Sequence, residues 1–233
     1  MTKPNIVHIF VESMSYYDIA ALGNDEVLTP NLDRLVAKGT TMIEAHNQGS
    51  FSGAVCVPSR GMLYTGRYLF GLNGSGGNVP SDHTLLGEYL GQHGYDTFHT
   101  GKWHMSRDSY RRNFQNGATI HCWAKGWYKE CNGHWHDPIH DFDPTGEFAA
   151  EDGRLASPLI PFEPPFTITE PGEDCVHSVE LFTNSAIEFL ETRADKRKPF
   201  FLDIPHITVH DPLQAPQRIL DLYKDRSVSL YPN

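Results

Sequence analysis

Apolar residues recur along the chain at two different spacings, which predict strands alternating with helices. The nearly continuous apolar, β-branched run at 5–11 is typical of a strand buried on both faces. Three further strands are predicted at 41–45, 96–100 and 200–204. The alternation predicts an α/β fold with a layered, mostly parallel sheet flanked by helices.

Helices are predicted over the segments 29–39, 56–66, 82–92 and 179–190. Gly39 and Gly66 stand where the first two helices should end. In the third, we expect Leu85, Leu86, Tyr89 and Leu90 to face inward. The pattern contains no internal repeat and no clear linker between domains.

Two stretches lack this periodicity. The segment 106–172 is rich in Gly, Pro, His and Trp, and we expect a long, loop-rich insertion over the sheet. The glycine-rich stretch 71–77 is expected to be a mobile loop. We therefore expect 1–233 to form one domain that carries an insertion.

Composition narrows the possible partners and compartment. The chain has 233 residues, a formal net charge of −10 and four cysteines. The negative charge argues against nucleic acid and anionic membranes as partners, and the cysteine count does not suggest a disulfide scaffold. The sequence contains no run of about 18 apolar residues and no leader pattern. As given, it is expected to be cytoplasmic; if a signal peptide was removed, it is periplasmic or secreted.

Cys56 is placed at a loop-to-helix junction, with Arg60 one turn later. Pro58 suits the first turn of such a helix, and we expect Met62 and Leu63 to be buried. Helix N-termini favour anions, because their first N–H groups have no partner within the helix. A nucleophile and a permanent cation at this position suit attack on an oxyanion ester. The simpler alternative is a small buried cysteine on a core helix.

Polar side chains follow the predicted strands at their carboxyl ends, where open α/β sheets bind ligands. Glu12 and Ser13 follow the first strand, Lys102 and His104 follow the strand at 96–100, and His210 follows the last. The alternatives are structural roles: Lys102 as a solvated surface cation, His104 as a hydrogen-bonded histidine in the core, and His210 as a residue that shapes a turn. Together they indicate one cleft that also receives the Cys56 helix.

Four motifs occur in an order that resembles the type I sulfatases of the alkaline phosphatase-like superfamily. They are the T-P-N-L-D-R-L helix from Thr29, C-x-P-S-R from Cys56 with T-G-R after it, G-K-W-H from Gly101 and H-D-P from His210. The resemblance covers most of the chain except the middle insertion. It implies hydrolysis of a sulfate ester, such as that of a sulfated sugar, after a maturation enzyme converts Cys56 to formylglycine.

The resemblance also implies a role for each residue. Cys56, as formylglycine hydrate, would attack sulfur, and Arg60 would hold the oxygens of the nucleophile. Lys102 would hold sulfate oxygens. His104 would take a proton to collapse the covalent sulfated intermediate, and His210 would contact the sulfate or assist the leaving group.

The implied metal is Ca²⁺ or Mg²⁺, held by Glu12, Ser13 and Cys56. The family usually has two adjacent aspartates where this chain has Glu12 and Ser13. Its remaining metal ligands lie beyond the point where this chain stops, so we expect an N-terminal, C-terminally truncated portion whose own activity is open. The alternatives are a truncated, inactive anion-binding protein, or a phosphodiesterase or phosphonate hydrolase on the same fold.

A second cluster of metal-type side chains lies in the predicted insertion. It consists of His121, Cys122, Cys131, His134, His136 and His140. These residues can bind zinc, but the cluster has no C-x₂-C pair and fits no compact zinc finger. We therefore favour a substrate-side loop carrying tryptophans over a zinc site.

Overall fold

The computed structural model describes residues 2–51, 55–72, 76–121, 135–136, 176–210, 213–227 and 229. The chain divides into two compact units, so the absence of a clear linker in the sequence did not mean a single unit. The larger unit comprises Met1–Glu12 and Gln48–Gln214, and the smaller one comprises Ser13–Asn47 and Ala215–Asn233.

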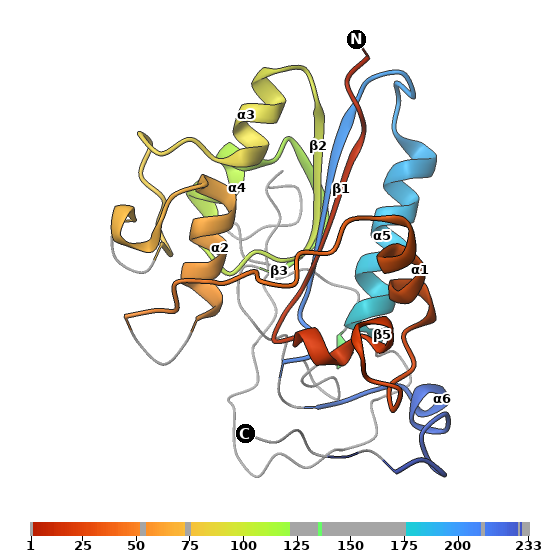
Figure 1. The fold of residues 1–233 in the computed structure, drawn as a ribbon. Helices are drawn as coiled ribbons and strands as arrows, with labels where there is room; N and C mark the ends of the chain where they lie inside the picture. The colour runs from red at the N-terminus through yellow and green to blue at the C-terminus, as the bar shows by residue number, and fades with distance from the viewer. Residues whose placement is uncertain are drawn as a thin grey trace. The chain divides into compact units, whose positions relative to one another are not determined.

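A four-stranded parallel sheet forms the centre of the larger unit (Figure 1). Its order is β1 (Ile6–Val11), β6 (Phe200–His206), β2 (Asp96–Lys102) and β3 (Asn116–His121). The predicted strands at 5–11, 96–100 and 200–204 are thus confirmed. All three pairings are parallel, so the strand ends that follow Val11, Lys102 and His206 lie at one edge of the sheet.

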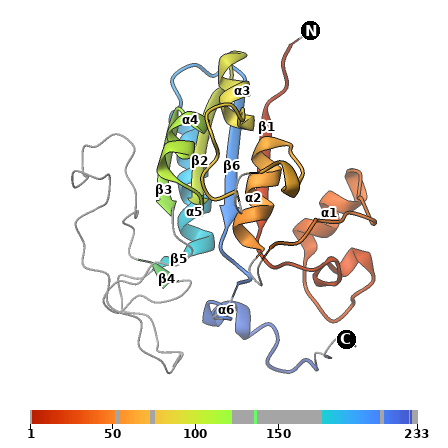
Figure 2. The ribbon, with the colours of Figure 1, turned by 90° about the vertical axis from the view of Figure 1, so that its left-hand side faces the viewer.

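Helices cover both faces of the sheet (Figure 2). One face carries α5 (Ser178–Thr192), and the other carries α2 (Cys56–Thr65), α3 (Leu86–Gln92) and α4 (Arg107–Asn113). This confirms the layered α/β class. The unit also contains the short 3₁₀ helix η3 (Leu69–Gly71) and the antiparallel pair β4 (Trp135–His136) and β5 (Val176–His177).

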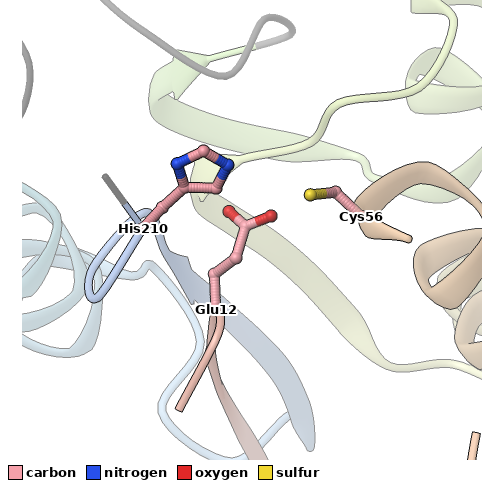
Figure 3. A group of neighbouring side chains, drawn as sticks. All are labelled: Glu12, Cys56 and His210. Carbon is pink, nitrogen blue, oxygen red and sulfur yellow. The ribbon is translucent and has the colours of Figure 1, made fainter. Parts of the chain in front are cut away.

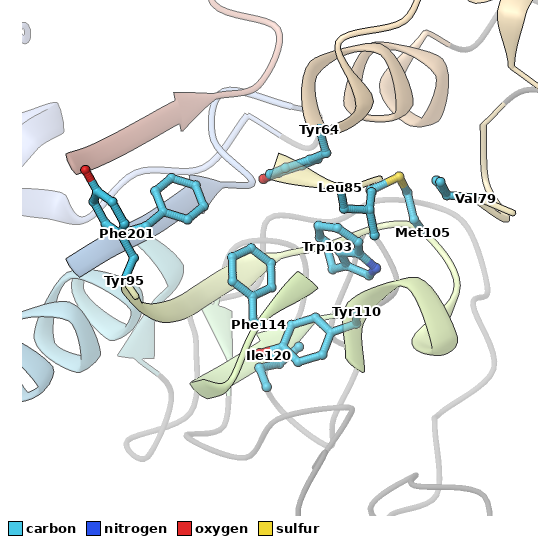
Figure 4. Close-up of a cluster of buried hydrophobic side chains, with 10 residues drawn as sticks. All are labelled: Tyr64, Val79, Leu85, Tyr95, Trp103, Met105, Tyr110, Phe114, Ile120 and Phe201. Carbon is cyan, nitrogen blue, oxygen red and sulfur yellow. The ribbon is translucent and has the colours of Figure 1, made fainter. Parts of the chain in front are cut away.

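Each face of the sheet buries its own apolar cluster. Under α5, the buried residues are Phe98, Leu181, Phe182, Ala186, Phe189, Phe200, Leu202, Ile204 and Ile207. On the opposite face, aromatic rings fill the space between the sheet and α2 to α4 (Figure 4). There the Trp103 ring lies 4.8 Å from Tyr64 and 5.8 Å from Tyr110, centroid to centroid. Because Trp103 stands between Lys102 and His104, this packing also fixes the strand end that carries them.

Among its described residues, the smaller unit has four short helices. They are η1 (Tyr16–Asp18), η2 (Ala20–Leu22), α1 (Pro30–Lys38) and α6 (Gln217–Leu220). The helix predicted at 29–39 is confirmed, with Pro30 at its first position, although none of its residues is buried. Thr29 does not cap it; instead the hydroxyl of Thr29 accepts from the Ala20 N–H and donates to Asp33.

Several expectations about elements are wrong. The segment 41–45 is not a strand, and Met42 and Ile43 are exposed. The predicted insertion does not begin at 106, because α4 and β3 extend regular structure to His121; most of the rest, to 172, lies outside the described residues. Apolar periodicity is weak in α4 and β3 because polar residues such as Ser109 and Asn113 are buried there.

Burial also differs from the expectation at specific positions. Leu63, Leu86 and Tyr89 are exposed. Leu85 is buried as predicted and Leu90 is partly buried, whereas in α2 the inward position belongs to Tyr64 instead of Leu63. In β1, alternate residues are exposed, with Val7 and Ile9 at 52% and 55%. The reason is that β1 is an edge strand of the described sheet, so the strand is not buried on both faces. Of the glycine-rich stretch 71–77, residues 73–75 lie outside the described part.

The described helices include none that is both long enough and apolar enough to cross a membrane.

Replacing Phe182 with alanine should lower the free energy of unfolding by about 3–5 kcal/mol, because its ring is fully buried between α5 and the sheet. Ile187→Ala on the same helix is the matched control. Since Ile187 is 47% exposed, its truncation should cost under about 1 kcal/mol. Urea unfolding followed by circular dichroism measures both, and equal losses would contradict the packing described.

Candidate active site

A buried ion cluster joins the ends of β1 and β2 to helix α2. The Nζ of Lys102 donates to Oε2 of Glu12, and Nη2 of Arg60 lies 3.7 Å from the same oxygen. Nη1 of Arg60 donates to the backbone carbonyl of Lys102. Glu12 is only 4% exposed, and Arg60 and Lys102 are fully buried. The structure therefore brings together three side chains that the sequence placed in one cleft.

The charges of this cluster do not cancel. Burial raises the pKa of Glu12, but Lys102 and Arg60 outweigh burial and hold the pKa below its usual value. Burial lowers the pKa of Lys102, partly opposed by Glu12. One carboxylate thus faces two cations, and Nε and Nη2 of Arg60 have no hydrogen-bond partner among the described residues. A buried cluster with surplus positive charge and unused donors is suited to an anion.

Cys56 begins helix α2, as the sequence predicted, and Gly66 ends that helix with a φ of +63°. Burial raises the pKa of the thiol, and so does its hydrogen bond to the Glu12 carboxylate. The proximity of Lys102 and Arg60 lowers this pKa, but by less. Cys56 is therefore a neutral thiol at neutral pH, and the helix N-terminus does not make it a thiolate nucleophile.

His104 and His210 complete the group that the sequence singled out. Burial, with Lys102 and Arg60, lowers the pKa of His104 to about 4, so its imidazole is neutral and can accept a proton. His104 has a positive φ of 58°, and its Nδ1 has no hydrogen-bond partner among the described residues. His210 follows β6, and its ring lies beside Glu12 and Cys56 (Figure 3).

Glu12, Cys56 and His210 each offer one metal-ligand atom, and these three atoms lie within 4.8 Å of one another. Ser13 was predicted as a ligand beside Glu12, but it belongs to the smaller unit. In the cluster around His121, all positions except His121 fall on residues or side chains that the structure does not describe. His121 itself is buried at the end of β3.

Sequence analysis missed a second buried network in the middle of the sheet. Asp203 of β6 is fully buried and accepts from three donors: His8 Nδ1 at 2.6 Å, His99 Nδ1 at 2.8 Å and the Tyr64 hydroxyl at 2.7 Å. Burial raises its pKa, but the hydrogen bonds from the two histidines hold the pKa well below the usual value. The register places both histidines directly opposite Asp203.

The available signal was a single polar residue among apolar neighbours at positions 8 and 203. His99 gave no such signal, because Thr97 and Thr100 in the same strand are also polar. The alignment of positions 8, 99 and 203 across strands depends on register, which the sequence alone does not fix. The network reaches the active-site cluster through Gly101. His99 Nε2 lies 3.1 Å from the Gly101 carbonyl, and Gly101 has a φ of +118°. A Cβ at Gly101 would lie 2.3 Å from the Pro205 carbonyl oxygen, so glycine is required immediately before Lys102.

Comparison with known proteins identifies the family. The family model described as Sulfatase matches residues 4–231. The chain belongs to the sulfatase family. Its relatives include arylsulfatase G of Rattus norvegicus, 28% identical over 91% of this chain and 42% of that protein. The ulvan-active sulfatase of Formosa agariphila is 28% identical over all of this chain and 40% of its own length. The chain thus spans less than half the length of these relatives.

Solved structures confirm the fold. One, determined in complex with its substrate D-glucosamine-2-N,6-O-disulfate, matches with a TM-score of 0.67 and 23% identity, over 95% of this chain and 38% of that one. Another, in complex with k-i-k-neocarrahexaose, matches with a TM-score of 0.64 and 25% identity, over 96% of this chain and 49% of that one. The layered α/β sheet of this sulfatase-family chain is therefore shared with larger proteins of alkaline phosphatase-like fold.

Tyr64→Phe should lower the free energy of unfolding by about 1.5–3 kcal/mol, because it removes one of three donors to the buried Asp203 carboxylate while keeping the ring. Tyr89→Phe on exposed helix surface is the control and should change it by under about 0.5 kcal/mol. Denaturant unfolding at pH 7 compares the two. If both variants were as stable as the parent, the Tyr64 hydroxyl would not be supporting Asp203.

The buried histidines predict a loss of stability in acid. Burial, together with His177, lowers the pKa of His206 to about 4, whereas an unfolded histidine titrates near about 6.5. Between these values the unfolded chain binds a proton that the folded chain does not, so stability falls as pH drops from about 6.5 to about 4.

His206→Gln should shrink the loss of unfolding free energy between pH 7 and pH 4.5 by about 1–3 kcal/mol. The control is His93→Gln, because His93 is exposed on the surface. Urea titrations at the two pH values provide the measurement. A loss in His206→Gln as large as in the parent would show that His206 is not the group responsible.

Proposed function

We propose that this chain is the N-terminal part, 1–233, of the catalytic domain of a sulfuric ester hydrolase. The observation that carries the proposal is the buried Glu12–Arg60–Lys102 cluster, whose surplus positive charge faces Cys56 and His210. A sulfate monoester carries one negative charge and three exposed oxygens. These match two buried cations, one of which has unused donors.

We propose for each group the role that the family resemblance implies, and the positions of the groups support these roles. Cys56, once converted to formylglycine by a maturation enzyme, supplies the nucleophilic oxygen. Arg60 holds the oxygens at position 56, and Lys102 binds sulfate oxygens and offsets the charge that develops during attack. His104 is neutral at pH 7 and accepts a proton at its ring nitrogen. His210 lies across Glu12 from Cys56, and from that side it contacts the sulfate or the leaving group.

The proposed metal is Ca²⁺ or Mg²⁺, which would supply charge to orient the nucleophile. The test of fit is the donor chemistry. Oε1 of Glu12 is a buried oxygen with no hydrogen-bond partner in the described part of the chain, and it suits a hard cation. Position 56 offers an oxygen ligand for such a cation only after conversion to formylglycine. We therefore propose Glu12 and converted Cys56 as ligands in the mature form, with Ser13 as the third ligand that the family resemblance implies.

The substrate class we propose is a sulfated sugar. Relatives support this: one is named for activity on ulvan, and a matching structure holds a neocarrahexaose. No role for nucleic acid or a membrane is proposed. A formylglycine-generating enzyme is the required partner. The proposed place of action is the cytoplasm, or the periplasm or exterior where a signal directs export.

The first experiment is to co-express the chain with a formylglycine-generating enzyme and weigh the Cys56 peptide. We expect the peptide to be lighter by the mass difference between a CH₂–SH side chain and an aldehyde group. We also expect the chain to hydrolyse an aryl sulfate in preference to an aryl phosphate. The Lys102→Ala variant should lose at least about 100-fold in kcat/KM, whereas exposed Lys38→Ala should not change it.

The other outcomes separate the alternatives. Preference for the aryl phosphate would replace the proposal with a phosphodiesterase or phosphonate hydrolase. Formylglycine without turnover, but with sulfate binding that Lys102→Ala abolishes, would leave an anion-binding protein. Unmodified Cys56 in a host that matures other sulfatases would overturn the proposal.

A further inference from the structure

The side chains of Glu12, Cys56 and His210 converge from three separate segments (Figure 3). Glu12 follows β1, Cys56 begins α2, and His210 lies four residues after the end of β6. Their ligand atoms lie within 4.8 Å of one another. In a tetrahedral zinc site, ligand atoms are about 3.5 Å apart. Small rotations of the three side chains would close the difference, with no change in the fold.

Glu12 gives an independent indication of a ligand. Its Oε2 pairs with Lys102 and Arg60, but its Oε1 has no hydrogen-bond partner among the described residues. The side chain is 4% exposed, so water does not readily satisfy this oxygen. A buried carboxylate oxygen without a donor is costly unless something binds there.

We propose that, while Cys56 is still a thiol, the chain binds a zinc ion through Cys56 Sγ, one ring nitrogen of His210 and Glu12 Oε1. This inference concerns the unconverted chain and does not rest on the proposed hydrolysis. It differs from the proposed calcium or magnesium site in metal, in the use of His210 and in the chemical state of position 56.

Donor chemistry selects the metal. Ca²⁺ and Mg²⁺ take oxygen ligands, whereas one sulfur, one imidazole nitrogen and one carboxylate oxygen are the set that Zn²⁺ accepts. Three protein ligands leave one tetrahedral position for water or an anion. When zinc binds, the Cys56 S–H bond breaks, the proton goes to solvent, and the thiolate sulfur donates its electron pair to the metal.

The neighbouring cations set limits on this site. Lys102 and Arg60 beside Glu12 disfavour a dication, and the new thiolate offsets only part of that repulsion. We therefore expect weaker binding than in a closed structural zinc site, with an anion preferred in the fourth position. Conversion of Cys56 removes the sulfur and supplies oxygen instead. The maturation state of one residue would thus decide which kind of metal the site accepts.

The experiment uses the full chain, produced without a maturation enzyme, with the Cys56 thiol confirmed by mass. Cys122→Ser, Cys131→Ser and Cys175→Ser are introduced into the parent so that Cys56 is its only thiol. Zinc chloride is titrated in competition with a chromogenic chelator. We expect zinc to bind at this site with a stoichiometry of one per chain, more weakly than at a closed structural site. Cobalt in place of zinc should add a thiolate-to-metal absorption band in the near ultraviolet.

Two substitutions in this parent test the ligands, and one serves as a control. Cys56→Ser keeps the shape of the side chain but removes the sulfur, and His210→Ala removes the imidazole. Each should weaken zinc binding at least about 10-fold, or about 1.4 kcal/mol, and Cys56→Ser should abolish the cobalt band. His46→Ala, at an exposed histidine outside the site, should change neither. Zinc affinity unchanged in Cys56→Ser or His210→Ala would overturn the proposal.

A second measurement applies if the triple-serine parent does not fold. In the natural chain, zinc should slow alkylation of Cys56 by iodoacetamide, read as the mass of the Cys56 peptide. His210→Ala should remove this protection, and His46→Ala should retain it. Alkylation at the same rate with and without zinc would refute the site, whatever the outcome of the sulfatase assay.

Discussion

The larger unit depends on one buried carboxylate held between two buried cations. Charges removed from water must be paired, and breaking such a pair leaves an uncompensated charge at high cost. Glu12, Lys102 and Arg60 satisfy this requirement only when the end of β1, the end of β2 and the second turn of α2 meet. Since one carboxylate faces two cations, the interaction that fixes these elements also leaves positive charge over Cys56. Stability and anion binding therefore rest on the same side chains.

Asp203 provides a second such constraint beneath the first. Arg60 and Tyr64 are four residues apart on α2, so they lie on the same face, and Tyr64 reaches Asp203. Helix α2 is thereby held to the sheet at two successive turns by polar contacts as well as by packing. His99, a partner of Asp203, also faces the Gly101 carbonyl, next to Lys102. Displacement of this network would therefore move both cations of the site.

The sequence predicted those parts of the site that local pattern or strand ends determine. Cys56 and Arg60 are set by the turn of one helix, and Lys102 lies at the carboxyl end of a predicted strand. The remaining contacts depend on the register between strands that are far apart in the sequence. The Asp203 network needs three strands aligned, which no local pattern encodes.

Where the sequence misled, tertiary packing had replaced apolar periodicity. In α2 the inward position is taken by Tyr64 rather than by Leu63. Just before α3, Leu85 is buried as predicted, but Leu86 is exposed. Helix α4 buries Ser109 and Asn113, and the Asn113 amide oxygen accepts from the N–H groups of Gly87 and Glu88 at the start of α3. A buried polar residue that caps another helix is indistinguishable in sequence from a loop residue.

The state of Cys56 links these constraints to chemistry. A cysteine beside two cations and a helix N-terminus would ordinarily ionise more easily. Here burial and the hydrogen bond to Glu12 raise the pKa of the thiol instead. The site thus has the charge to hold an anion but keeps its own sulfur neutral. Nucleophilic chemistry at position 56 then requires the thiol to be changed, either by oxidation to an oxygen nucleophile or by loss of its proton to solvent when a metal binds the sulfur. Burial and the carboxylate that joins the fold's elements together keep the unconverted cysteine protonated.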